Sequence, residues 1–141
     1  MSLTDQIFAA GIVGCGGAGF PTHAKLNGDA EWIILNAAEC EPLLRTDHYI
    51  LRHLAGRVIA AASAVRRELG DIRCTVATKS AYRQELTALR EAIAQIDPEI
   101  SIHEMESFYP AGDEQTLVAE VTGQAVPPAG IPLDVGCVVS N

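Results

Sequence analysis

Short apolar runs alternate along this chain with longer segments of helical periodicity. Trp32 to Leu35 is an unbroken apolar run of the kind found in a strand buried on both faces. Further strands are predicted at 73–78, 100–102 and 135–139, and helices at 4–10, 21–26, 86–96 and 115–121. Strands that alternate with helices predict an α/β fold with a mostly parallel sheet and helices on its faces.

One amphipathic segment is longer than the others. Its apolar positions recur every three to four residues, and they are Leu51, Leu54, Val58, Ala61 or Ala62, Val65 and Leu69. Asp47 and Gly70 bracket them as start and stop signals. The pattern predicts one long helix with these residues on its buried face.

Composition and charge narrow the class of protein. A chain of 141 residues with 48% hydrophobic and 20% charged residues has the balance of one globular domain. Its net charge of −8 repels phosphate backbones, which argues against nucleic-acid partners and anionic membranes. With no basic, apolar leader and no run of about 20 apolar residues, we expect a cytoplasmic protein without membrane insertion.

The cysteines and histidines show no ligand spacing. Cys15, Cys40, Cys74 and Cys137 form no Cys-x-x-Cys pair, so we expect reduced thiols and no metal site within the chain. The histidines are not paired either. We therefore place His23 near the glycine-rich segment, and His48, His53 and His103 on the surface.

Residues 14–19, Gly-Cys-Gly-Gly-Ala-Gly, form a glycine-rich loop between two predicted helices. Gly14, Gly16 and Gly19 satisfy G-x-G-x-x-G, and Gly17 is an additional glycine. No strand precedes the loop, so an ordinary dinucleotide fingerprint does not apply. The loop can still offer consecutive N–H groups to a phosphate, with Lys25 as a nearby charge. The alternative for the glycine-rich loop is a turn that only connects two packed helices. The alternative for Lys25 is a solvated surface side chain.

Two polar clusters follow predicted strands. Asn36, Glu39 and Glu41 come after the first strand, where ligands of open parallel sheets bind. The second cluster, 109–114, is a Tyr-Pro-Ala-Gly turn that ends in Asp113 and Glu114 at a predicted helix start. The simpler explanations are loop charges for the first cluster and helix capping for the second.

Taken together, these motifs are specific. The run Gly-Cys-Gly-Gly-Ala-Gly-Phe-Pro-Thr-His-Ala-Lys (14–25) resembles the flavin- and NADH-binding domain of the respiratory complex I flavoprotein subunit. It is still more similar to the C subunit of the Rnf-type electron-transport complex and to soluble relatives. These relatives include the cobalamin reductase of propanediol utilisation and the electron-transfer protein linked to proline reductase. The segments 36–42, 109–114 and 138–141 match this family in the same order.

The resemblance implies a set of binding residues and no catalytic side chain. Those implied for FMN are Gly14, Gly16, Gly17, Gly19, Lys25, Asn36, Glu39, Tyr109, Gly112, Asp113 and Asn141. Phe20, Glu41 and Glu114 match positions that face NADH. The fold implied is a three-layer, Rossmann-like α/β domain in which the glycine-rich loop between helices binds the flavin.

The resemblance also implies a function. Residues 1–141 would be a single FMN/NADH-binding domain, the N-terminal part of a longer NAD(P)H-dependent flavoprotein oxidoreductase. FMN would accept hydride from NAD(P)H and pass single electrons to iron–sulfur clusters in the later part of that protein, or to a cobalamin or reductase partner. Two alternatives remain: a docking domain that keeps the fold without a working flavin, and a nucleotide-binding regulatory module.

Overall fold

The computed structural model describes residues 1–15, 18–26 and 29–141. In this part of the chain, four parallel strands form one sheet in the order β3-β2-β1-β4. The strands are β1 (Trp32–Ala37), β2 (Arg73–Lys79), β3 (Ser101–Met105) and β4 (Cys137–Ser140). Each overlaps a predicted strand, and the predicted α/β fold with a parallel sheet is confirmed.

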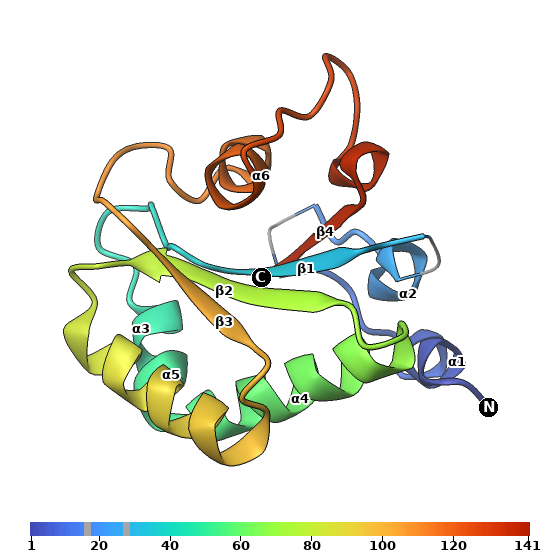
Figure 1. The fold of residues 1–141 in the computed structure, drawn as a ribbon, viewed down its shortest axis with the longest axis horizontal. Helices are drawn as coiled ribbons and strands as arrows, with labels where there is room; N and C mark the ends of the chain where they lie inside the picture. The colour runs from blue at the N-terminus through green and yellow to red at the C-terminus, as the bar shows by residue number, and fades with distance from the viewer. Residues whose placement is uncertain (16–17, 27–28) are drawn as a thin grey trace.

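The helices cover both faces of the sheet. They are α1 (Leu3–Ala9), α2 (Thr22–Lys25), α3 (Thr46–His53), α4 (Ala55–Glu68), α5 (Arg83–Ile96), α6 (Glu114–Thr122) and the 3-10 helix η1 (Pro132–Val135). Figure 1 shows α3, α4 and α5 on one face and α6 on the other, which gives the expected three layers.

Side-chain alternation along β1 explains why both faces are covered. Ile33 packs with α4 and α5 residues such as Ile59 and Leu89, whereas Ile34 packs with Leu117 of α6. Ile33 and Ile34 are 2% and 0% exposed, so the run that begins at Trp32 is buried on both faces as predicted.

The long helix predicted from Asp47 to Gly70 is wrong in one respect, because the structure divides it into α3 and α4. Leu54, with φ −129°, interrupts the helical backbone. Its N–H still donates to Ile50, and its carbonyl accepts from Val58, so the break costs few hydrogen bonds. Beyond it the buried positions shift by one residue from Leu54 and Val58 to Ala55 and Ile59, and Leu54 is 37% exposed. Ala62 is buried, as one of the two predicted alternatives.

The amino-terminal helices form a small unit against the β4 edge. Ser2 caps α1 and Asp5 completes its capping box, so the cap lies earlier than Thr4 or Asp5, where the sequence placed the helix start. The N–H of Leu3 donates to Glu68 Oε1 at the end of α4 (3.1 Å). Ile7 and Leu26 pack with Val138 of β4. The first and last segments of the chain are therefore neighbours.

The connections between strands create an opening beside β1. The helices that link β1 to β2 and β2 to β3 lie on one face, and α6, which links β3 to β4, lies on the other (Figure 1). The connection that leaves β1 and the connection that enters β4 therefore lie on opposite faces of the sheet. Such a topological switch point leaves a crevice at the carboxyl ends of the two strands, where open α/β sheets bind ligands.

Candidate functional site

A cavity of about 440 Å³ lies at this switch point. It is lined by the end of β1, the end of β4, the glycine-rich segment, α2 and the start of α6. The predicted site residues that line it are Gly14, Gly19, Phe20, Lys25, Asn36, Gly112, Glu114 and Asn141. Its size is within the range of cofactor sites.

The described ends of the glycine-rich loop form a hairpin-like closure. The N–H of Gly14 donates to the Phe20 carbonyl (2.8 Å), and Val13 bridges Pro21 in antiparallel fashion. Gly19 has φ +63°, a conformation that glycine adopts without strain. Gly16 and Gly17 lie outside the described residues, so their predicted roles stay predictions.

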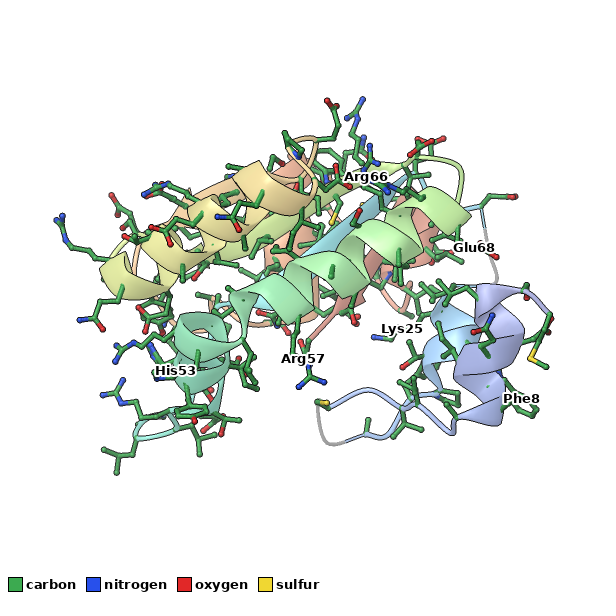
Figure 2. The ribbon with its side chains drawn as sticks, turned by 90° about the horizontal axis from the view of Figure 1, so that it is seen from below. Phe8, Lys25, His53, Arg57, Arg66 and Glu68 are labelled. Carbon is green, nitrogen blue, oxygen red and sulfur yellow. The ribbon has the colours of Figure 1, made fainter. Side chains whose placement is uncertain are left out.

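Lys25 ends α2 and joins three walls of the cavity. Its Nζ donates to the Val139 carbonyl of β4 (2.9 Å) and lies 3.5 Å from Glu114 Oε1 at the start of α6. It also lies 5.7 Å from the centre of the Phe20 ring. In Figure 2 its side chain extends from α2 towards the rest of the domain, whereas Phe8 lies on the far side of α1. Lys25 is therefore a cavity residue rather than a solvated one.

Asn36 and Gly112 join two cavity-forming loops. Asn36 Nδ2 donates to the Gly112 carbonyl (2.9 Å), and Asn36 Oδ1 accepts from the Ala38 N–H (3.2 Å). A Cβ on residue 112 would lie 2.5 Å from the Ala38 carbonyl oxygen and 3.3 Å from Cys40 Sγ. Glycine is therefore needed at 112 for the close approach of the turn to the loop after β1.

Four of the predicted residues, all within the described part of the chain, do not line the cavity: Glu39, Glu41, Tyr109 and Asp113. Asp113 caps α6 by accepting from the Thr116 N–H (3.0 Å), which favours helix capping as its explanation. Tyr109 is 77% exposed. Glu41 is exposed, with its carbonyl bonded to the Leu44 N–H (3.4 Å).

Glu39 is held in place by residues of α3, β2 and the loop that follows β2. Its side chain accepts from the Asp47 N–H (3.3 Å), near the start of α3. Its carbonyl accepts from Lys79 Nζ (3.1 Å) and from the Tyr82 hydroxyl (3.0 Å). Burial and the Glu39 carboxylate raise the pKa of Asp47. These contacts fix the backbone of the loop after β1.

Sequence reasoning missed the apolar wall of the cavity. Ile131, Pro132 and Leu133 line it from the segment before and within η1, and Val138 lines it from β4. Residues 126–132 are rich in proline, a composition typical of an extended connection rather than of a cavity wall. The sequence feature that could have indicated this wall is that the segment directly precedes the predicted last strand.

The surface assignment of His48 is wrong. His48 is 8% exposed, and its Nδ1 lies 2.7 Å from Oε1 of Glu85, which is 1% exposed. Arg52 Nε donates to the same oxygen (2.6 Å), and the His48 ring packs on Tyr82 at 4.2 Å between centroids. Burial by itself raises the pKa of Glu85. Hydrogen bonds from His48, the backbone and Arg52 outweigh that effect, so its pKa is lowered.

Comparison with known proteins identifies the fold around this cavity. Residues 7–141 match the family described as the Nuo51 FMN-binding domain. The chain belongs to this family. The resemblance noted in the sequence is thereby confirmed, and family membership supports a flavin electron-transfer role.

Relatives of this FMN-binding domain include longer redox proteins. The chain is 37% identical over 140 residues to cobalamin reductase PduS of Citrobacter freundii, covering 99% of this chain and 30% of that protein. It is 33% identical over 144 residues to the C subunit of the Na+-translocating ferredoxin:NAD+ oxidoreductase complex of Acetobacterium woodii, covering 99% of this chain and 32% of that relative. The chain thus spans about a third of the length of these relatives.

A solved structure shares the fold. The NAD+-reducing NiFe hydrogenase in the H2-reduced state superposes with a TM-score of 0.85 at 25% identity, covering 98% of this chain and 28% of that chain. Within residues 1–15, 18–26 and 29–141, no helix has the length and apolar character needed to cross a bilayer.

The residues around the cavity fit a flavin mononucleotide. Ile131, Leu133 and Val138 supply an apolar wall suited to a flat ring. Lys25 supplies a cation for a phosphate. Asn36 Nδ2 carries two N–H groups, and Gly112 accepts one of them, so the second can serve a ligand.

Proposed function

We propose that this domain binds FMN in the cavity between β1 and β4 and acts as an electron-entry domain of a longer oxidoreductase. The single observation that carries the proposal is the cavity at the switch point, whose lining combines the Lys25 ammonium with apolar side chains such as Ile131 and Val138. The match of residues 7–141 to an FMN-binding family supports it independently.

Each wall of the cavity would take a different part of the cofactor. The Lys25 ammonium would bind the phosphate, and Gly14 and Gly19 would let backbone approach it closely. Ile131 and Val138 would pack against the ring and exclude water. Asn36, Gly112, Glu39, Tyr109, Asp113 and Asn141 remain the proposed polar contacts, together with Gly16 and Gly17.

The nucleotide would approach from the open side of the cavity. Phe20 is 51% exposed and lines the cavity, so its ring can pack against a second aromatic group. Glu114 also lines the cavity, and Glu41 is the third proposed nucleotide contact. When bound, FMN would supply the acceptance of a hydride from NAD(P)H and its release as two single electrons and a proton. Iron–sulfur centres in the rest of a longer protein, or a partner reductase, would receive them.

The names of the relatives support a role in a longer oxidoreductase. One relative is called a cobalamin reductase and another belongs to a ferredoxin:NAD+ oxidoreductase complex, and both are about three times as long as this chain. We propose by analogy that residues 1–141 are one domain of a longer protein, and that NADH is its donor. A corrinoid or an iron–sulfur protein is then the acceptor.

Titration of the purified protein with FMN tests the proposal. We expect quenching of flavin fluorescence with saturation, and weaker binding by Lys25→Met. Arg90→Met is the matched control, because Arg90 pairs with Glu104 beside β3, at the opposite edge of the sheet. Absence of FMN binding while circular dichroism shows an intact fold would refute FMN binding and favour a docking domain.

A second measurement tests the donor. Under anaerobic conditions, NADH should bleach the visible absorbance of the bound flavin, and NADPH is the comparison. A flavin that binds but stays oxidised with both nucleotides would retain the FMN site and reject the hydride role.

A further inference from the structure

The contact between Lys25 and Glu114 joins two residues to which different ligands are proposed. Lys25 is the proposed phosphate contact, and Glu114 is a proposed nucleotide contact. Their Nζ and Oε1 atoms lie 3.5 Å apart, with both side chains lining the cavity. The ion pair therefore spans the space between the two proposed ligands.

The two partners differ in their freedom to move. The Lys25 side chain is 28% exposed, and its Nζ is tied to the Val139 carbonyl at 2.9 Å. The Glu114 side chain is 46% exposed and belongs to the first residue of α6. Glu114 can thus turn into solvent at little cost, whereas Lys25 is held where it is.

The charges of the phosphate and of the Glu114 carboxylate determine which of the two anions Lys25 binds. Among the described residues that line the cavity, Lys25 is the only basic one. A phosphate monoester carries about −1.5 to −2 charges at neutral pH, against −1 for a carboxylate. Two anions around one ammonium in a partly buried site repel each other, so the phosphate should replace the carboxylate.

We propose that Glu114 is a displaceable counter-ion that occupies Lys25 until a phosphate-bearing ligand binds, and is then released towards the nucleotide side of the cavity. This inference rests on the proposed function. Glu114 then lowers the affinity for the phosphate, because it competes for Lys25. When the phosphate site is occupied, Glu114 is free to contact a second ligand.

The test compares FMN with riboflavin, which lacks the phosphate. Glu114→Gln keeps the shape of the side chain and removes its charge. It should tighten FMN binding by about three- to fivefold, the scale of an exposed charge pair, and leave riboflavin binding unchanged. The inhibition constant of inorganic phosphate as a competitor of FMN should fall by about the same three- to fivefold in the Gln variant.

Glu120→Gln is the matched control. Glu120 lies on the same helix, contacts His103 at 3.7 Å and does not line the cavity, so Glu120→Gln removes one negative charge from α6 without altering the cavity lining. It should leave the ratio of FMN to riboflavin affinity unchanged. An equal effect of both substitutions would attribute the change to overall charge and overturn the inference.

The remaining outcomes separate the two proposals. If both flavins bind and Glu114→Gln leaves that ratio unchanged or lowers it, the displaceable counter-ion is wrong and the FMN site stands. If neither flavin binds to the folded protein, the proposed function fails, and this inference fails with it.

Discussion

Replacing Gly112 with alanine should destabilise the fold through a single contact. The added Cβ would lie 2.5 Å from the Ala38 carbonyl oxygen, a distance that requires the backbone to shift. The shift would also stretch the hydrogen bond from Asn36 Nδ2 to the Gly112 carbonyl (2.9 Å). Overpacking of this kind costs about 1–3 kcal/mol. At this chain length that corresponds to a decrease of about 3–10 °C in Tm.

The same substitution elsewhere in the chain provides the control. Gly56 lies in α4, and a Cβ there would meet only Ile96 Cδ1, at 4.0 Å. Because alanine favours a helix over glycine, Gly56→Ala should raise stability by about 0.5–1 kcal/mol. Thermal unfolding followed by circular dichroism, without flavin, measures both variants. An unchanged Tm for Gly112→Ala, or equal decreases for the two variants, would refute the steric reasoning.

Three further predictions concern other parts of the chain. Glu85→Gln should cost about 1–3 kcal/mol near pH 7 in urea unfolding. Because its folded pKa is lowered, the stability that Glu85 contributes is present above its ordinary pKa of about 4.5 and is lost as pH falls; the variant should therefore lose less stability than the wild type in acid. A thiol reagent should modify exposed Cys15 in the native protein. Cys74, which is buried and has its pKa raised to about 11, should react only after unfolding, and equal rates for the two would contradict the fold. Asp113→Ser should keep the α6 cap and Asp113→Ala should cost about 1 kcal/mol; FMN binding lost in both variants would make Asp113 a ligand contact as well as a cap.

Local patterns predicted the elements of this fold well. Apolar runs and helical periods depend on neighbours within a few residues, so β1, α5 and the α/β alternation followed from the sequence. The break at Leu54 did not, because the amide and carbonyl on either side keep their helical partners. The helical hydrogen bonds therefore continue through the break, while the buried face shifts by one residue to Ala55 and Ile59.

Long-range partners were beyond local patterns. His48 and Glu85 are 37 residues apart, and nothing near either residue indicates that they share a buried hydrogen bond. The carbonyl partner of Lys25 is 114 residues away, on Val139. The motifs predicted Lys25, Asn36 and Glu114 as site residues. The three-dimensional structure was needed to show that these three residues line the same cavity.

The wall formed by β4 has a consequence for synthesis. The cavity takes Gly14, Phe20 and Lys25 from the first fifth of the chain and Val138 to Asn141 from its other end. β1, β2 and β3 with their helices can associate while later residues are still within the ribosome, but Lys25 has no Val139 carbonyl to bind until β4 emerges. A nascent chain can therefore pair three of its four strands before this cavity is complete, and under the proposed function FMN would bind only after β4 has joined the sheet.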